Sequence, residues 1–196
     1  MTGVPGVGKT TVCSMLAAQY PGRYCHVSFG KLILEALESG ERALSYSGLR
    51  REVSKFVTPA VIERATRLLE ERARSAEPTI WTVVDSHAVS QDWYGYRVTA
   101  DGPRYFAVIR YKAIVNLFAN AGAVLNRTVL DRAGRHALSE KELELHSGLQ
   151  AAVSICYGSL SECPVFFVDA GGDIKAVVER VDAVLKGCEG ESIPVP

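Results

Sequence analysis

The sequence predicts an α/β domain in which a parallel β-sheet carries helices on both faces. Three observations predict this class: helical and strand-like patterns alternate, short segments are apolar across their whole width, and a glycine-rich loop opens the first helix. The 196 residues suit one domain, which we place at 1–186. Residues 187–196 have no pattern and are expected to form a flexible tail.

The chain up to residue 84 is expected to alternate between helices and strands. Thr58 followed by Pro59 is a favoured helix start, because the threonine side chain caps the first turn and proline there needs no amide partner. The segment 79–84 is apolar and rich in β-branched residues, which is typical of a strand covered on both faces. We therefore expect helices over 10–19, 31–38 and from 58 onward, and strands over 24–29 and 79–84.

The remainder of the chain continues this alternation. Ser139 and Glu142 form a capping box that opens a long helix. Buried strands are expected over 112–118 and 165–168, and further helices over 121–131 and 173–185. The long helix is predicted to carry an apolar stripe of the kind that packs against a core, formed by Leu149, Val153, Cys156 and Leu160.

Charge and composition exclude several classes of protein. The 22 Lys+Arg residues balance the 22 Asp+Glu residues, whereas proteins that bind bulk nucleic acid or anionic membranes usually carry a basic excess. No segment reaches the about 18 consecutive apolar residues of a membrane helix, and the N-terminus lacks a secretory signal pattern. The five cysteines share no Cys-x-x-Cys spacing, so reduced thiols are expected. We expect a cytoplasmic protein that is a monomer or a small homo-oligomer.

Residues 3–10 match the P-loop pattern at every specified position. Glycines let backbone amides converge on phosphate oxygens, and the following helix directs its positive end at the same anion. Lys9 is expected to reach the β- and γ-phosphates of ATP, and the Thr10 hydroxyl to bind Mg²⁺. The alternative is a glycine-rich turn before an amphipathic helix. The predicted nucleotide contacts are Gly3, Pro5, Gly6, Val7, Gly8, Lys9, Thr10 and Thr11.

A P-loop normally follows a β-strand, yet only Met1 and Thr2 precede Gly3. The central strand of a P-loop NTPase core is therefore expected to be truncated here, and we expect the missing strand residues to lie upstream of this sequence.

A second acidic position follows the strand that ends near residue 84. Asp85 stands where P-loop enzymes place a carboxylate that organises the Mg²⁺ shell; the alternative is an aspartate that caps a turn. His87 lies two residues further on and would face the same way as Asp85 if the strand continued. We interpret His87 as a residue that bonds a phosphate or orients a water, with a purely structural histidine as the alternative.

Several motifs together resemble the archaeal-type adenylate kinases and the related dual adenylate kinase and ATPase proteins of ribosome assembly. They are the P-loop, Ser28-Phe29-Gly30, Asp85-Ser86-His87, Gly95-Tyr96 and Tyr157-Gly158. The resemblance extends from the P-loop to the last helix. It implies a P-loop kinase core with a helical region that binds a nucleoside monophosphate and a small lid. The implied activity is Mg²⁺-dependent phosphoryl transfer from ATP to AMP.

Carried over by position, the resemblance places the acceptor-side helical region at about 30–75 and the lid at about 127–140. Phe29 and Gly30 would begin the acceptor side, where Arg50, Arg51 and Lys55 would bind the acceptor phosphate; a solvated helix face is the alternative for these three. Arg127 and Arg132 would act on the transferring phosphoryl group, and Arg135 would contact ATP.

The chain departs from the family pattern in two places. The loop after His87 carries an aromatic cluster, and we predict that Trp93, Gly95 and Tyr96, with Tyr94 beside them, contact the base or another flat part of the acceptor. An ordinary hydrophobic loop contact is the alternative. The long helix also lacks the arginine that the family tends to place around Leu149 and Gln150. AMP is therefore less firmly implied as acceptor than ATP is as donor.

These observations support three functional hypotheses. The first is a kinase that uses ATP and Mg²⁺ to phosphorylate a nucleoside monophosphate or a related small nucleoside-like molecule, with lid closure excluding water. The second is an ATPase switch that acts on a protein or ribonucleoprotein partner. The third is a nucleotide-binding module without catalytic activity.

Overall fold

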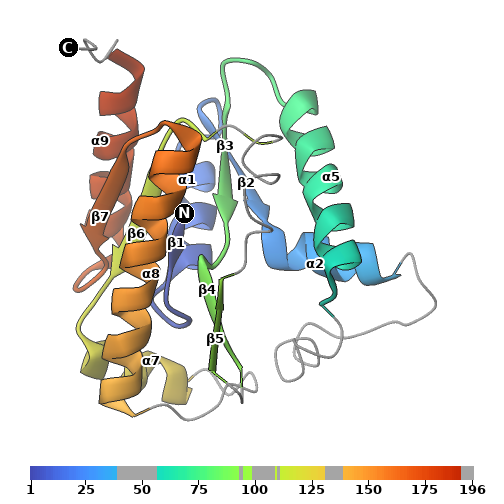
Figure 1. Ribbon diagram of the computed structural model, residues 1–196. Coiled ribbons are helices and arrows are strands. Elements are labelled where there is room, and N and C mark those ends of the chain that lie inside the picture. Colours follow the sequence, from blue (N-terminus) through green and yellow to red (C-terminus); the bar gives the residue numbers. More distant parts are fainter. Residues whose placement is uncertain (39–56, 93–94, 99–108, 110, 131–138, 191–196) are drawn as a thin grey trace.

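The computed structural model describes residues 1–38, 57–92, 95–98, 109, 111–130 and 139–190. Much of the described chain alternates between strands and helices as the sequence predicts, but the strands at 89–92 and 95–98, which pair antiparallel, were not predicted (Figure 1). The strands are β1 (Thr2–Gly3), β2 (Tyr24–Ser28), β3 (Trp81–Asp85), β4 (Val89–Asp92), β5 (Gly95–Val98), β6 (Ile114–Phe118) and β7 (Val165–Asp169). The helices are α1 (Lys9–Gln19), α2 (Phe29–Glu38), α5 (Pro59–Ser75), α7 (Ala121–Leu130), α8 (Glu140–Ser161) and α9 (Ile174–Gly190).

Parallel strands form the centre of the fold. β2 pairs with β3, and β1 pairs with β6, which pairs with β7, all in parallel. Main-chain hydrogen bonds at Met1 join the two groups: its nitrogen donates to the Val84 carbonyl at 2.6 Å, and its carbonyl accepts from the Ser86 amide at 3.0 Å. The strands therefore follow one another in the order β2, β3, β1, β6, β7. The predicted parallel sheet is confirmed.

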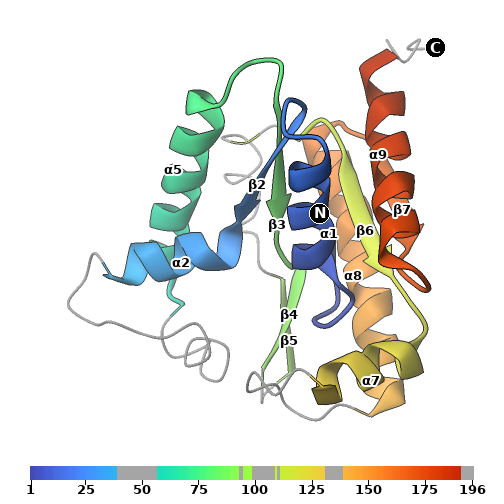
Figure 2. The ribbon, with the colours of Figure 1, turned by 180° about the vertical axis from the view of Figure 1, so that it is seen from behind.

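Helices cover both faces of these strands. α1 and α9 lie together on one face, and α8 crosses the other, as the two opposite views show (Figures 1 and 2). α2 and α5 pack against each other beside β2 and β3. One apolar core is shared by α1, α9 and the central strands and includes Val12, Leu16, Leu117, Val177 and Val181. A second core joins α2 and α5 to β2 and β3. None of the helices in the described ranges is long and apolar enough to cross a membrane.

Local sequence signals explain two of the helix starts. The Thr58 side chain accepts a hydrogen bond from the Val61 amide, and Pro59 follows at the first helical position of α5. At α8 both bonds of the capping box form, since the Ser139 hydroxyl accepts from the Glu142 amide while the Glu142 carboxylate accepts from the Ser139 amide. Both predicted starts are confirmed.

Several predicted boundaries differ from the structure. α2 begins at Phe29, directly after β2, so Phe29 and Gly30 belong to a helix rather than to a strand end and a turn. α9 continues to Gly190, so the flexible tail does not begin at residue 187. β7 is only partly buried, with Phe167 exposed to 45%, because in the described part of the chain β7 pairs with β6 alone and lies at the edge of the sheet.

The predicted apolar stripe of α8 is wrong. Cys156 is exposed and Leu160 is 49% exposed, and the side chains that face the sheet are mostly small or polar. Close approach of the helix to β6 and β7 explains this pattern, because Gly158 leaves no room for a side chain beside Val165. The buried residues of α8 are Leu143, His146, Gln150, Ser154 and Gly158.

The contact at Gly158 generates a prediction about stability. A Cβ there would overlap the Val165 side chain and lie 3.1 Å from the Cys163 carbonyl oxygen. Gly158→Ala is therefore expected to lower the free energy of unfolding by about 1–2 kcal/mol, because overpacking outweighs the gain in helix propensity. Urea denaturation followed by circular dichroism measures the change.

The matched control is Gly148→Ala, on the exposed side of the same helix, where a Cβ meets nothing within 4 Å. It is expected to raise the free energy of unfolding by up to about 1 kcal/mol. Equal stabilisation by both substitutions would show that α8 does not press on β7 at Gly158.

Candidate active site

The loop between β1 and α1 has the backbone shape that a phosphate-binding loop requires. Gly3 has φ of 137°, and a Cβ at this position would collide with the Leu117 carbonyl oxygen of β6. Gly8 has φ of 109° and stands at the N-cap of α1, where no side chain caps the first amides. Those amides have no partner within the helix, and the positive end of the helix dipole lies at the same point. The loop therefore offers amide donors to an anion.

The remaining predicted loop residues divide into two groups. Val7 is buried in the core and holds the loop against the domain, whereas Pro5 and Gly6 are partly exposed. Thr10 and Thr11 lie exposed on the first turn of α1, where ligands have access to their hydroxyls.

Lys9 lies inside the loop rather than in solvent. It is only 5% exposed, and its Nζ donates to the carbonyl oxygens of Gly3 at 2.7 Å and Val4 at 3.0 Å. These main-chain oxygens hold the ammonium group beside the amides at the start of α1. A cation and a set of amide donors therefore meet at one place, as the sequence predicts for a triphosphate site.

Asp85 ends β3 next to this loop. His26 Nε2 lies 3.2 Å from Oδ2 of the carboxylate, and the Thr10 side chain lies close enough to favour its charged form. Burial would raise the pKa of Asp85, but the bonds from His26 and Thr10 and the charge of Lys9 outweigh it and lower this pKa. The carboxylate is therefore ionised at neutral pH.

The pairing of Thr10 with Asp85 fits a magnesium ion. Mg²⁺ prefers oxygen ligands and keeps several waters, so it needs one or two protein oxygens together with substrate phosphates rather than a closed cage. A hydroxyl and an ionised carboxylate close to each other, beside a phosphate-binding loop, are such a donor set.

His87 follows Asp85 and contacts the loop from the other side. Its Nδ1 lies 3.2 Å from the Gly3 carbonyl oxygen, which also accepts from Lys9. Burial and then the Lys9 charge hold the pKa of His87 well below its usual value, so the ring is neutral at neutral pH. Because a carbonyl only accepts, the proton of the neutral ring is on Nδ1, and Nε2 is the acceptor nitrogen.

Arg127 has a different environment from the one predicted. It belongs to α7, and its guanidinium donates to the Val7 carbonyl at 3.2 Å and to the Ala170 carbonyl at 3.1 Å. It therefore joins the loop to the turn after β7, with both bonds going to main chain. In this geometry Arg127 supports the loop, and its action on the transferring phosphoryl group stays a prediction.

The hairpin formed by β4 and β5 is held on α8 by side chains that the sequence reasoning missed. Gln150 is fully buried, and its Oε1 accepts from the amides of Ala88 and Val89 while its Nε2 donates to the Val89 carbonyl at 2.6 Å. His146, also fully buried, lies beside it with Nε2 3.0 Å from the same carbonyl. The segment that follows Asp85 is thus fixed on the long helix.

Tyr96 packs on this helix as well. Its ring centroid is 5.2 Å from that of His146, and its hydroxyl donates to the Glu142 carbonyl at 3.3 Å. Gly95 begins β5 with φ of 131°, a backbone conformation that suits glycine. Tyr96 is therefore a contact between these strands and the helix, and its predicted contact with a flat part of the acceptor stays a prediction.

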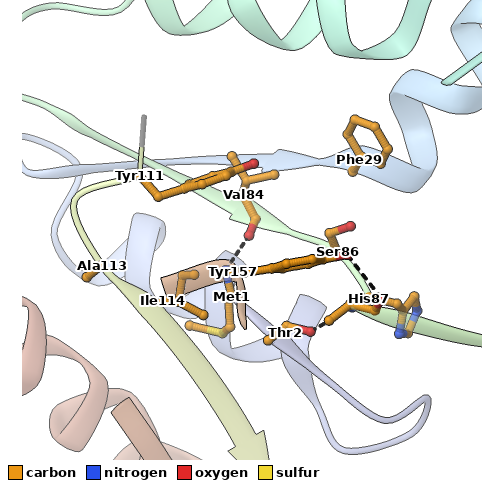
Figure 3. Close-up of a pocket in the computed structure, with 11 residues that line it drawn as sticks. Met1, Thr2, Phe29, Val84, Ser86, His87, Tyr111, Ala113, Ile114 and Tyr157 are labelled. Atoms are coloured by element: carbon orange, nitrogen blue, oxygen red, sulfur yellow. Dashed lines mark hydrogen bonds between the residues drawn. The ribbon is translucent and has the colours of Figure 1, made fainter. Parts of the chain in front are cut away.

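A cavity lies beside His87 on the side of Phe29. Figure 3 shows three aromatic side chains around it, Phe29 from the start of α2, Tyr111 from the segment before β6, and Tyr157 from α8. Phe29 is only 5% exposed and also belongs to the core shared by α2 and α5. Gly30 is partly buried in the first turn of α2. The complete lining is Met1, Thr2, Phe29, Val84, Ser86, His87, Ala88, Tyr111, Ala113, Ile114 and Tyr157.

The remaining predicted residues lie outside the part of the chain that the structure describes. They are Arg50, Arg51, Lys55, Trp93, Tyr94, Arg132 and Arg135. The structure thus brings together the loop, Lys9, Thr10, Asp85 and His87, and adds His26, Gln150 and His146 to the candidate site.

A parallel sheet whose first strand leads through such a loop into a helix defines a P-loop NTPase-like domain. The sequence profile of the family described as "AAA domain" matches residues 2–145, and the chain belongs to this family.

Curated relatives extend the comparison over nearly the whole chain. It is 25% identical over 195 residues to a protein of Thermococcus onnurineus named adenylate kinase, with 97% of this chain and 96% of that protein covered. Proteins of the same name from Thermococcus sibiricus and Methanopyrus kandleri are 27% and 28% identical, over 95% and 93% of this chain and 92% and 95% of theirs. The resemblance that the motifs indicated is confirmed.

The two bonds of Arg127 generate a prediction. Arg127→Met removes both donors, so it is expected to lower the free energy of unfolding by about 1–2 kcal/mol, since the side chain is partly exposed and each charged hydrogen bond is worth less there. It is also expected to weaken ATP binding, because the Val7 carbonyl loses its support. Chemical denaturation and isothermal titration calorimetry measure these effects.

The control for Arg127 is Arg67→Met on α5. The Arg67 side chain is 65% exposed and pairs with Glu63 on the same helix, so its loss should change stability by less than about 0.5 kcal/mol. If Arg127→Met unfolds at the wild-type denaturant concentration, the guanidinium does not support the loop.

Proposed function

We propose that this protein transfers the γ-phosphoryl group of ATP to a nucleoside monophosphate of the AMP type, or to a related small nucleoside-like acceptor, with Mg²⁺ as cofactor. The observation that carries the proposal is the meeting of Lys9, Thr10 and Asp85 at the glycine loop. The relatives named adenylate kinase, which align over nearly the full chain, support a small nucleotide as acceptor.

On the donor side, the loop residues would bind the phosphates of ATP. The amides at the start of α1 and the Lys9 ammonium would hold the β- and γ-phosphates, because amide dipoles and a cation in a buried site stabilise the charge that spreads over the transferring group. Thr10 and Asp85 would hold Mg²⁺, which when bound neutralises charge on the phosphate oxygens. Thr11 and Arg135 would contribute further contacts to ATP.

On the acceptor side, we assign the cavity next to His87 to a flat ring of the acceptor. Phe29, Tyr111 and Tyr157 line this cavity with aromatic rings. Aromatic side chains bind nucleobases by stacking, with little preference for one base over another. Trp93, outside the described residues, would add to this surface. Neutral His87 would orient the attacking oxygen through its acceptor nitrogen, since phosphoryl transfer needs alignment more than a strong base.

The acceptor phosphate would need cations from elsewhere in the chain. The buried face of α8 carries Gln150 where the family pattern suggests an arginine, and that amide is used in bonds to Ala88 and Val89. We assign the acceptor phosphate to Arg50, Arg51 and Lys55, and the closure over the transferring group to Arg132 in a lid at about 127–140. Differences in acceptor preference between this protein and its relatives would arise at these residues.

An acceptor panel tests the proposed reaction. Purified protein is incubated with ATP and Mg²⁺ alone, with nucleoside monophosphates and with nucleosides, and ADP and phosphorylated product are quantified by chromatography. We expect ADP to form together with a phosphorylated monophosphate, fastest with AMP, because lid closure would exclude water from the transferring group. Acceptor-independent release of phosphate would contradict the kinase and support the ATPase alternative. ATP binding without either product would support the binding module.

A substitution of Lys9 tests the loop itself. Lys9→Ala removes the only cation that the described residues place inside the loop, so turnover is expected to fall by about three or more orders of magnitude. Lys175→Ala, an exposed lysine on α9, serves as control and should leave turnover unchanged. Near-normal turnover of folded Lys9→Ala protein would remove the loop from the mechanism.

A further inference from the structure

His26 lies where it reaches the candidate magnesium site from a neighbouring strand. β2 pairs with β3 in parallel with His26 opposite Val83 and Ser28 opposite Asp85. Side chains alternate along a strand, so His26 and Ser28 share one face, and on β3 the same face carries Val83 and Asp85. This is the face that α1 covers, since Val83 packs in the core with α1 residues such as Leu16.

The ring of His26 has a partner on each side. Nε2 lies 3.2 Å from Asp85 Oδ2, and Nδ1 lies 3.2 Å from the hydroxyl oxygen of Ser14 on α1. The side chains of His26 and Asp85 are only 14% and 9% exposed. An ionised carboxylate accepts but cannot donate, so the proton of this bond is on Nε2. In the neutral ring, Nδ1 then accepts from Ser14.

The Asp85 carboxylate is consequently held at Oδ2 by His26 from β2. Thr10 lies near the same carboxylate at the start of α1. A carboxylate that can turn about its side-chain bonds binds an ion less well than one already oriented, because ordering it costs conformational entropy. Groups that hydrogen-bond a metal ligand from behind therefore raise metal affinity without touching the metal.

We propose that His26 is a positioning residue that orients Asp85 for Mg²⁺ through the bond from Nε2 to Oδ2. This inference rests on the proposed function, in which Asp85 and Thr10 hold the ion. His26 contributes nothing to ATP binding in the absence of Mg²⁺. Its effect is confined to the increase in ATP affinity that Mg²⁺ causes, which we call the Mg²⁺-dependent gain.

The test compares ATP binding in saturating Mg²⁺ with ATP binding in EDTA, by titration calorimetry at one fixed pH. Binding of Mn²⁺ to the protein–ATP complex, followed by electron paramagnetic resonance, gives a second readout without turnover. His26→Phe removes the donor and keeps a flat ring. It is expected to leave the affinity in EDTA unchanged and to reduce the Mg²⁺-dependent gain about 10-fold, within the range of about 10–100-fold found for such supporting groups.

A conservative variant and a control on the same strand separate orientation from general packing. His26→Gln offers an amide donor to Asp85 and should recover most of the gain. Tyr24→Phe removes a buried bond to Asp182 of 2.8 Å from the same face of β2, and should lower stability without changing the ratio of the two affinities. His26→Leu replaces the phenylalanine variant if the latter does not fold.

A double-mutant cycle tests whether His26 acts through Asp85. In an Asp85→Asn background, His26→Phe should cause no further loss of the Mg²⁺-dependent gain. An additive loss, or an unchanged gain in folded His26→Phe protein, would overturn the inference while leaving the proposed function intact. Absence of any Mg²⁺-dependent gain in the wild-type protein would instead reject the proposed magnesium site.

Discussion

The carbonyl oxygen of Gly3 connects the parts of this site. It accepts from Lys9 Nζ at 2.7 Å and lies 3.2 Å from His87 Nδ1, so Lys9 and His87 contact the same atom. The position tolerates no side chain, because a Cβ would collide with the Leu117 carbonyl oxygen and the backbone has φ of 137°. A glycine at this point therefore allows the loop to lie against β6 while presenting its carbonyl to both partners.

The long helix α8 shows how packing and function share the same residues. Its buried face is polar where it crosses the segment after Asp85, and Gln150 supplies both an acceptor and a donor to the main chain there. Burying an amide costs free energy unless its bonds are made, and here Ala88, Val89 and Thr2 make them. The helix thereby fixes the backbone that carries His87. The close contact at Gly158 keeps the same helix near β7.

In the part of the chain that the structure describes, the candidate site has few charged groups and many supporting contacts. Lys9 and Asp85 are its buried charges, and the charge of Lys9 lowers the pKa of both Asp85 and His87. Arg127 and His26 touch main chain or another side chain, and both act on the geometry of their neighbours. Phosphoryl transfer suits this arrangement, because it depends on alignment and on fixed positive charge more than on covalent chemistry by the protein.

Local patterns in the sequence predicted most of the elements, though not β4 and β5, and they predicted the residues proposed for the donor side of the site. The glycine spacing, the lysine and the strand-end carboxylate at Asp85 are each encoded within a few residues, and so are the caps at Thr58 and Ser139. These features depend on backbone geometry and hydrogen bonds between near neighbours, which a short segment specifies by itself.

Contacts between distant segments were decided only by the tertiary structure. The sequence predicted the strand that carries His26 and hence the alternation of its side chains between the two faces. The bond from His26 to Asp85, however, depends on the register of β2 against β3. Arg127 faces Val7 and Ala170, because the packing of α7 against the sheet assigns each side chain its neighbours. The packing of α8 leaves Leu145, Ile155 and Leu160 exposed for the same reason. Periodicity gives the spacing of a helix face but not the surface that covers it, so these roles had to come from the folded chain.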